Sequence, residues 1–279
     1  MTLCCLNGVI GPVSEARISP LDRGFLFGDG VYEVLAHVDG VTRAKQLHRD
    51  RLEKSLTAIG LSASVSLDTV FSDMDRLLAA SGLQSAKLYL QITRGPAAER
   101  DHRFPRTVDP TVFLMASPWS PSVLGPQAAM IAPDIRWHRN HIKSISLLAN
   151  VLIQQQASEA GAIDALLHRD GWLTEASTSN AFVFQDGALL TPPLSEQLLP
   201  GITRHLVLDL AAAQGFSVIE TEIAIDQLPR ADLVMITSST RGLVPITRLI
   251  PDQIIGRGHV PDYFERLQSA YQRVLHAHP

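Results

Sequence analysis

The chain reads Asp22-Arg23-Gly24-Phe25-Leu26-Phe27-Gly28-Asp29-Gly30-Val31-Tyr32-Glu33 where a glycine-rich turn gives way to an apolar segment. The residues that follow this turn predict a β-strand over residues 30–38. One interpretation of the turn is a glycine-rich ligand loop in a binding module without enzymatic activity. The turn lacks the Gly-x-Gly-x-x-Gly spacing after a strand that such nucleotide-binding loops have. The sequence therefore argues against a binding module at this turn.

The first part of the chain outward from this strand predicts an α+β unit. Apolar residues recur at helical spacing in two segments, and two further apolar segments predict strands. The predicted helices cover residues 46–61 and 68–80, and the strands cover 87–93 and 111–116. A proline-rich stretch follows and is the best linker candidate in the chain. We expect a domain at residues 1–117, a linker at 118–128 and a second domain at 129–279.

The second part of the chain alternates predicted helices and strands. We expect a helix that starts near Lys143 and runs through Ala160, and a hairpin that turns at Asp186-Gly187. Helices are also predicted from Gly201 to about residue 214 and over 263–275, and strands over 164–168, 181–185, 188–190 and 233–237.

Composition limits the classes of partner. The chain has 279 residues, of which 46% are hydrophobic and 19% charged, and its net charge is -4. This mildly acidic balance argues against nucleic acid or an anionic membrane as the main partner. No apolar stretch approaches the roughly 18 residues that a membrane span needs.

The cysteines and the N-terminus bear on the compartment. Cys4 and Cys5 are adjacent, which is poor geometry for a disulfide and leaves no ligands for a zinc site. The N-terminus resembles no secretory signal. We expect a protein of the reducing cytoplasm.

Lys143 is the lysine with the most unusual setting. The chain has only three others, Lys45, Lys54 and Lys87, and these resemble ordinary surface lysines. Lys143 enters an apolar run, and burial of an amine favours its neutral, nucleophilic form. One interpretation is a lysine that forms a Schiff base. The other is a lysine at a helix N-terminus whose amine reaches out to solvent.

A pyridoxal phosphate enzyme needs such a lysine, an acid for the pyridine nitrogen and donors for the phosphate. Glu175 lies in a predicted polar turn at 171–180, where it points into a cleft or is simply a solvated loop residue. The amides of Ile202 and Thr203 follow Gly201 at a helix start that suits a phosphate, although an ordinary capped helix also fits. Ser239, after a predicted strand, adds a hydroxyl.

Four segments of the chain together resemble the fold-type IV pyridoxal phosphate enzymes, the class IV aminotransferases. They are residues 22–33, Asp134-Ile135-Arg136-Trp137 with Ile142-Lys143-Ser144, Thr174-Glu175-Ala176-Ser177-Thr178-Ser179-Asn180, and Gly201-Ile202-Thr203-Arg204. They occur in the family's order, between about residue 7 and about residue 250. The resemblance implies a two-domain D-amino acid aminotransferase-like fold of mixed α+β and α/β class. The small N-terminal domain would be α+β and the larger C-terminal domain a pseudo-barrel.

The resemblance also implies roles for individual residues. Lys143 would hold pyridoxal phosphate as a Schiff base and then shuttle the substrate proton. Glu175 would keep the pyridine nitrogen protonated. Arg51 matches the family's phosphate-binding arginine, which suits a charge-assisted contact. The remaining phosphate donors would be Ile202, Thr203 and Ser239.

The segment Ile92-Thr93-Arg94-Gly95-Pro96-Ala97-Ala98-Glu99-Arg100-Asp101-His102-Arg103-Phe104-Pro105 bears on the choice within the family. It resembles the loop of D-amino acid aminotransferases, in which an arginine and a histidine join a tyrosine to bind the substrate α-carboxylate. Arg100, His102 and Tyr32 match those positions, although the loop is one residue longer than is typical. Arg241 stands where these enzymes commonly have a small polar residue, and it would bind a substrate side-chain carboxylate or a nearby surface acid.

The resulting expectation is transamination between a D-amino acid and a 2-oxo acid by a ping-pong mechanism, in a homodimer. D-alanine or D-glutamate would be the donor, and 2-oxoglutarate or pyruvate the acceptor. A branched-chain L-amino acid aminotransferase or a 4-amino-4-deoxychorismate lyase is the alternative within the family.

Overall fold

A computed structural model describes residues 2–276, and contacts group the chain into two compact units. The first unit comprises the residues up to Ser120 together with Ile142–Ser146. The second comprises Pro121–His141 and the residues from Leu147 onward. The short segment Ile142–Ser146 thus makes its contacts with the first unit, although it follows the predicted linker. The domain limits given above stay a prediction.

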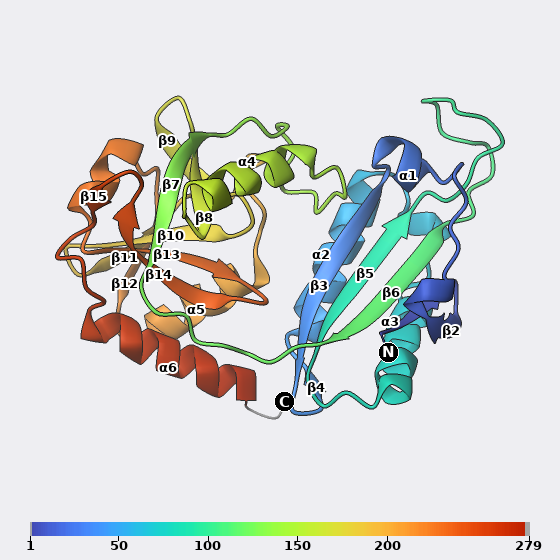
Figure 1. The fold of residues 1–279 in the computed structure, drawn as a ribbon, viewed down its shortest axis with the longest axis horizontal. Helices are drawn as coiled ribbons and strands as arrows, with labels where there is room; N and C mark the ends of the chain where they lie inside the picture. Colours follow the sequence, from blue (N-terminus) through green and yellow to red (C-terminus); the bar gives the residue numbers. More distant parts are fainter. Residues whose placement is uncertain (1, 277–279) are drawn as a thin grey trace. The chain divides into compact units, whose positions relative to one another are not determined.

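The first unit is an antiparallel six-stranded sheet with helices packed against it (Figure 1). Its strand order is β2-β1-β6-β5-β3-β4. The strands are β1 (Leu3–Leu6), β2 (Val9–Pro12), β3 (Gly30–Val38), β4 (Val41–Thr42), β5 (Ala86–Thr93) and β6 (Thr111–Pro118). The helices are α1 (Arg23–Phe27), α2 (Lys45–Ala58) and α3 (Leu67–Ser81), with 3-10 turns at Val13–Glu15 and Ser62–Ser64.

Local sequence signals explain the helix limits and the core of this unit. The Ser66 hydroxyl accepts from the Thr69 amide and caps α3, which ends at Gly82 with φ 65°. One side of α2 and α3 buries leucines, valine and phenylalanine against alternate residues of the strands, since side chains on a strand point to opposite faces. The sheet is therefore covered by one apolar core under these two helices.

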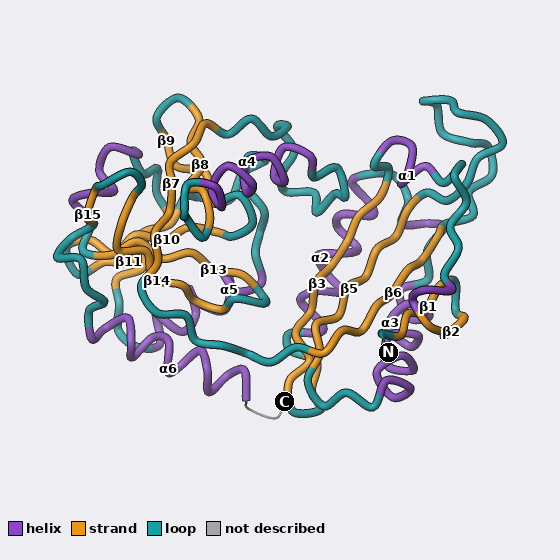
Figure 2. Tube along the Cα trace, viewed as in Figure 1, coloured by secondary structure: helices purple, strands orange, loops and turns teal. Residues whose placement is uncertain are grey.

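The second unit is built on a curled nine-stranded sheet (Figure 2). The strand order is β12-β11-β10-β13-β14-β7-β8-β9, with β15 paired to β14. These strands are β7 (Gln127–Pro133), β8 (Asp164–Arg169), β9 (Trp172–Ala176), β10 (Asn180–Gln185), β11 (Ala188–Thr191), β12 (Ser217–Glu220), β13 (Leu233–Ser238), β14 (Gly242–Leu249) and β15 (Gln253–Ile254). The helices are α4 (Leu148–Glu159), α5 (Ile202–Ala213) and α6 (Asp262–His276), with a 3-10 helix at Ile225–Arg230.

Alternation along β13 shows how this sheet is buried on both sides. Val234 and Ile236 belong to the core inside the curl, whereas Leu233 and Met235 belong to the core shared with α5 and α6. Such a strand has no solvated face, which explains its continuous apolar sequence. The predicted fold, an α+β unit followed by a pseudo-barrel unit, is confirmed.

Most predicted elements agree with the structure within a few residues, and β3 agrees at both ends. The hairpin turn at Asp186-Gly187 is confirmed, with φ 51° and 78° at the two residues. Within residues 2–276, none of the helices has both the length and the apolar character that crossing a bilayer demands.

The helix predicted from Lys143 begins instead at Leu148, so that prediction was wrong by about one turn. The Tyr32 amide donates to the Lys143 carbonyl (2.9 Å), and the Ile145 amide donates to the Gly30 carbonyl (3.1 Å). Because residues 143–145 pair with the start of β3, they are extended and cannot join the helix. The predicted polar turn around Glu175 was also wrong, since Glu175 lies on strand β9.

Candidate active site

Lys143 lies beside Tyr32 in the first unit. Its Nζ is 4.3 Å from the centroid of the Tyr32 ring, and the side chain is half-buried. The backbone amide of Lys143 donates to the Ser55 hydroxyl (3.3 Å), so the segment is attached to α2 as well as to β3. The helix N-terminus required by the solvent-reaching interpretation is absent at Lys143, because α4 begins five positions later, at Leu148. The amine is held against an aromatic face on a backbone that is fixed from both sides.

Glu33 anchors a buried ion pair in the same unit. Its Oε1 accepts from Arg51 Nε (2.8 Å), and its Oε2 accepts from Arg51 Nη2 (2.7 Å) and His48 Nδ1 (2.6 Å). Burial alone would raise the pKa of Glu33, but Arg51 and His48 lower it to about 2. Arg51, the predicted phosphate ligand, is therefore oriented by a carboxylate to which sequence reasoning assigned no role.

Burial also lowers the pKa of His48, with Arg51 and Lys143 acting in the same direction and Glu33 opposing them. A neutral imidazole that donates through Nδ1 leaves one negative and one positive charge in the cluster of Glu33, His48 and Arg51. The effect of Lys143 on His48 indicates that the Lys143 amine is within electrostatic range of this cluster.

Arg100 and His102 lie on the connection between β5 and β6, and both side chains are exposed in the single chain. The Arg100 guanidinium carbon is 4.9 Å from the centroid of the Phe27 ring, and the His102 ring centroid is 5.1 Å from it. The structure thus brings the predicted arginine and histidine to one ring. Tyr32, the third predicted member, contacts Lys143 and the Tyr89 ring.

In the second unit, Glu175 is buried on β9 with every carboxylate oxygen engaged. Arg136 Nη1 donates to Oε1 (2.6 Å), and Oε2 accepts from Asn180 Nδ2 (3.0 Å) and the Leu199 amide (3.2 Å). Burial raises the pKa of Glu175 to about 7, and Arg136 and the Leu199 amide oppose this rise. The interpretation of Glu175 as a solvated loop residue was therefore wrong, because only 3% of the residue is exposed.

Arg136 is held for this contact by a second acid. Asp134 accepts from Arg136 Nε and Nη2 at 2.9 Å each, and Arg169 Nε lies 3.3 Å from the same carboxylate. Burial would lower the pKa of Arg136, but its two acidic partners raise it. The Asp-x-Arg spacing at 134–136 lies in one of the segments that resemble the family, and it marks the guanidinium that pairs with Glu175.

The first turn of α5 carries the predicted amides of Ile202 and Thr203. Gly201 is the N-cap residue and no side chain caps the helix within the described part of the chain. A Cβ at Gly201 would lie 1.9 Å from Asn180 Oδ1. Asn180 in turn donates to Glu175 (3.0 Å), so the helix start and the buried acid are joined through one amide.

Hydroxyls from β13 and its following turn complete this group. Thr237 pairs with Asn180 across the sheet, and its buried Oγ1 has no hydrogen-bond partner among residues 2–276. Ser239 follows two positions later and is half-buried. The amides of a helix N-terminus and a hydroxyl without a partner among residues 2–276 suit an anion. With a buried acid for the ring nitrogen, this donor set fits pyridoxal phosphate.

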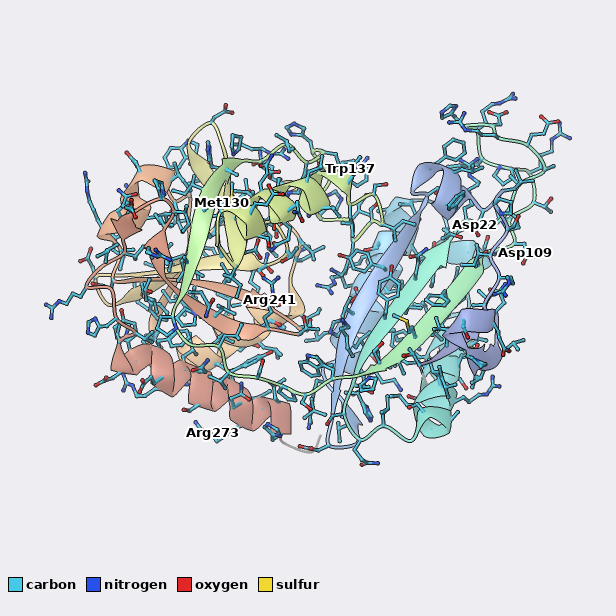
Figure 3. All side chains as sticks on the ribbon, viewed as in Figure 1. Asp22, Asp109, Met130, Trp137, Arg241 and Arg273 are labelled. Carbon is cyan, nitrogen blue, oxygen red and sulfur yellow. The ribbon has the colours of Figure 1, made fainter. Side chains whose placement is uncertain are left out.

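Arg241, which is labelled in Figure 3, forms an ion pair with Asp164. Asp164 Oδ2 accepts from Arg241 Nη1 at 3.0 Å. Asp164 is buried and also accepts from the hydroxyls of Ser177 and Thr178. Of the two partners expected for Arg241, an acid of the chain itself is observed, although it is a buried acid and not a surface one.

Comparison with known proteins identifies the family of the chain. The family model for amino-transferase class IV matches residues 30–249. The D-alanine aminotransferase of Bacillus licheniformis is 38% identical over 272 residues, which cover 96% of this chain and 95% of that one. The D-alanine aminotransferase of Staphylococcus aureus strain N315 is 32% identical over 278 residues, which cover 98% of each.

Solved structures agree in fold. A branched-chain amino acid aminotransferase from Escherichia coli superposes with a TM-score of 0.88 at 22% identity, covering 97% of this chain and 93% of that one. A fold IV transaminase from Curtobacterium pusillum covers both chains completely, with a TM-score of 0.82 at 23% identity. With a family model over most of its length and relatives above 30% identity along nearly all of it, the chain belongs to the class IV aminotransferases, which are pyridoxal phosphate enzymes.

Proposed function

We propose that this protein transfers the amino group of a D-amino acid to a 2-oxo acid in two half-reactions. D-alanine and D-glutamate are the proposed donors, and pyruvate and 2-oxoglutarate the proposed acceptors. The observation that carries the proposal is the placement of Arg100 and His102 on one aromatic ring, in the loop that matches D-amino acid aminotransferases. The D-alanine aminotransferases that match most of the chain at 31–38% identity support it.

Lys143 is the proposed catalytic residue. Pyridoxal phosphate, when bound, supplies an electron sink that makes the substrate Cα proton acidic. The Lys143 amine holds the cofactor between reactions and carries that proton during each half-reaction. Its place beside the Tyr32 ring supports this role, because the backbone on both sides is fixed and the amine has a defined direction.

Glu175 is proposed to keep a proton on the pyridine nitrogen. A carboxylate can do this only while it is ionised, and burial works against ionisation. Arg136, at 2.6 Å, supplies the opposing charge. Asn180 and the Leu199 amide use Oε2, which fixes the orientation of the carboxylate.

The phosphate would be bound by Arg51, by the amides of Ile202 and Thr203, and by the Ser239 hydroxyl. Within the second unit two features support this assignment: among the described residues no side chain caps the start of α5, and the Thr237 hydroxyl has no hydrogen-bond partner. The bidentate pair with Glu33 supports it for Arg51, since it holds the guanidinium in one orientation.

Tyr32, Arg100 and His102 are proposed to bind the substrate α-carboxylate. A guanidinium binds a carboxylate through two parallel hydrogen bonds, and phenol and imidazole add single donors. If Lys143 works from one face of the cofactor, the side that holds the carboxylate decides which enantiomer presents its proton to Lys143. This geometry is the proposed basis of D-specificity.

A scan of half-reactions tests the substrate class. The holoenzyme is mixed with single D- and L-amino acids, and the conversion of the aldehyde form of the cofactor to the amine form is followed by absorbance. We expect conversion with D-alanine and D-glutamate. Conversion with L-leucine alone, or release of 4-aminobenzoate from aminodeoxychorismate, would instead support the branched-chain or lyase alternative.

Borohydride reduction tests the role of Lys143. Reduction should remove the yellow colour and leave the cofactor as a covalent label on the peptide that contains Lys143. The exposed Lys54 provides the matched control position, because K54Q should keep both colour and label. Label on another lysine would contradict the assignment.

We further propose a homodimer located in the cytoplasm. Helix α4 exposes Leu148, Val151 and Leu152 to 72%, 59% and 50%, and a second copy of the chain is the proposed cover for these side chains. Light scattering on the purified holoenzyme tests the dimer, with a monomer mass contradicting it. The buried, unpaired Cys4 and Cys5 support a reducing compartment.

A further inference from the structure

The connection that carries Arg100 and His102 has almost no regular structure of its own. Residues 94–110 join β5 to β6 and form neither helix nor strand. Connections longer than about 12 residues without secondary structure are uncommon, and they are usually either functional loops or disordered linker segments. Within the loop, Asp101 accepts from the Arg103 amide (3.0 Å) and from Arg103 Nε (2.8 Å). Further contacts come from outside the loop. Apart from one pairing of Pro96 with Asp22, the loop cannot take its shape from a sheet.

Arg23 supplies such an anchor from helix α1. Its side chain is buried, and its guanidinium donates to three consecutive carbonyl oxygens of the loop. Nη1 donates to the carbonyls of Asp101 and Arg103, the latter at 3.2 Å, and Nη2 donates to that of His102 at 3.2 Å. Arg23 therefore holds the backbone on both sides of His102.

Asp29 balances the charge of this buried guanidinium. Its Oδ2 accepts from Arg23 Nε (2.8 Å) and from Arg94 Nε (2.8 Å), and its Oδ1 accepts from Arg94 Nη2 (3.0 Å). Two arginines thus share one carboxylate. A buried arginine is tolerated only when it is paired and its donors are satisfied. Arg23 Nη1 and Nη2 donate to carbonyl oxygens of the loop. The loop backbone therefore helps to satisfy the hydrogen-bond donors of this buried side chain.

Arg94, the first residue of the loop, joins the same cluster to Phe104. Its guanidinium carbon lies 3.6 Å from the centroid of the Phe104 ring, and Nη2 donates to the Ile59 carbonyl (2.7 Å). Phe104 is 61% exposed in the single chain, so it gains its position from this cation–π contact and not from a core.

Phe27 links the anchor to the two substrate-binding side chains. It is one turn after Arg23 on α1, and the Arg23 guanidinium carbon is 4.8 Å from its ring centroid. Arg100 and His102 rest on the same ring, at 4.9 Å and 5.1 Å. Helix α1, which carries Arg23 and Phe27, begins at Asp22, labelled in Figure 3. Asp22 caps the helix and accepts from the hydroxyls of Thr93 and Thr111.

We propose that Arg23 is a positioning residue for substrate recognition, which orders the β5–β6 loop and sets Arg100 and His102 on Phe27. The proposal rests on the proposed function in one respect, namely that Arg100 and His102 bind the substrate carboxylate. Arg23 itself does not touch the substrate. It acts through three backbone hydrogen bonds, and Phe27 acts through the ring contacts.

Variants of Arg23 test this in the holoenzyme by two independent measurements. R23Q removes the positive charge and most of the N–H groups of the guanidinium. R23K keeps a positive charge, but its N–H groups are fewer and lie on a single nitrogen. We expect R23Q to increase amide hydrogen exchange of residues 97–108 about tenfold, which corresponds to about 1.4 kcal/mol. We expect KM for D-alanine to rise about tenfold with kcat changed less than twofold, because the loop acts in binding. R23K should be intermediate in both.

R106Q is the matched control, since Arg106 is an exposed arginine of the same loop. It should leave exchange, KM and kcat unchanged. F27L is the second variant, which keeps the Arg23 to Asp29 pair and so preserves the fold if R23Q does not fold. It should raise KM with little change in exchange of the loop backbone. Unchanged KM in F27L, or unchanged exchange in R23Q, would overturn the proposal.

R100Q separates this proposal from the proposed function. If R100Q raises KM but R23Q and F27L do not, Arg100 binds substrate and the positioning role of Arg23 is rejected alone. If R100Q leaves KM unchanged, the carboxylate assignment fails and the positioning role falls with it.

Discussion

Arg136 Nη1 lies 2.6 Å from Glu175 Oε1, and both side chains are buried in the second unit. Burial raises the pKa of Glu175 to about 7, and this ion pair is the largest influence in the opposite direction. The ionisation of Glu175 near neutral pH therefore depends on Arg136.

Replacement of Arg136 should make the enzyme require a higher pH. R136M removes the cation, so the pKa of Glu175 rises further and the carboxyl is protonated at neutral pH. The ascending limb of kcat/KM for D-alanine with 2-oxoglutarate should move to higher pH by about one unit or more, with activity recovering in alkali. R136K should move it less, and R230M, which alters an exposed arginine, should not move it. An unmoved limb in R136M would contradict the dependence.

Loss of the Glu33 carboxylate should destabilise the protein. E33Q leaves Arg51 buried without its charge partner, and breaking a buried pair costs about 3–5 kcal/mol. Urea unfolding at neutral pH should show that loss. E53Q changes an exposed glutamate of the same helix that carries Arg51 and should alter the free energy of unfolding by less than about 0.5 kcal/mol.

The same contact should depend on pH in a defined direction. The pKa of Glu33 is lowered from 4.5 to about 2, so the folded protein holds fewer protons on this group than the unfolded chain. Its stabilisation is therefore complete above the unfolded pKa and is lost as the pH falls through the folded pKa. The difference in unfolding free energy between wild type and E33Q should shrink in acid. A constant difference would show that the stabilisation is not electrostatic.

Local sequence signals predicted the elements that depend on local causes. Strand β3 was predicted at both ends because its apolar residues follow a glycine turn. The helix start near Lys143 was wrong because its cause is distant, namely the hydrogen bond from Tyr32 to the Lys143 carbonyl. An apolar run that pairs with a strand looks like the first turn of a helix, since both bury the same residue types.

The site residues likewise differ in whether the local sequence gives a signal for their contacts. Glu33 carried a usable signal, because it shares the buried face of β3 with Val31 and Leu35, and a charge there requires a partner. The pairing of Arg241 with Asp164 carried none, since the residues are 77 positions apart and belong to separate elements. The cofactor and substrate roles of the individual residues stay predictions that the experiments above address.

Replacement of Arg241 should not change substrate preference. Because its guanidinium is engaged by Asp164, R241A should change kcat/KM for D-glutamate and for D-alanine by the same factor, within about twofold. Steady-state kinetics with both donors measures the ratio, and R248A, on an exposed arginine of β14, is the control. A tenfold selective loss for D-glutamate would mean that Arg241 leaves Asp164 to bind the substrate side chain.

Substitution of Gly201 should weaken cofactor binding without unfolding the protein. In G201A the new Cβ would lie 1.9 Å from Asn180 Oδ1, so Asn180 must move. Asn180 donates both to Glu175 and to the Leu199 carbonyl (2.8 Å), and its displacement disturbs the buried acid and the start of α5 together. We expect the dissociation constant for pyridoxal phosphate, measured by titration of the apoenzyme, to rise at least tenfold.

The matched control is G11A, because a Cβ at Gly11 would meet nothing within 4 Å. It should leave both the dissociation constant and the unfolding free energy unchanged. In the proposed site, different groups contact the phosphate and the pyridine nitrogen, so the two effects of G201A can be separated with free phosphate as a competitor. If G201A weakens the binding of free phosphate and of pyridoxal phosphate by the same factor, only the helix start is disturbed and Glu175 keeps its place. If it weakens neither ligand, Asn180 adjusts without cost and is not the link between the two groups.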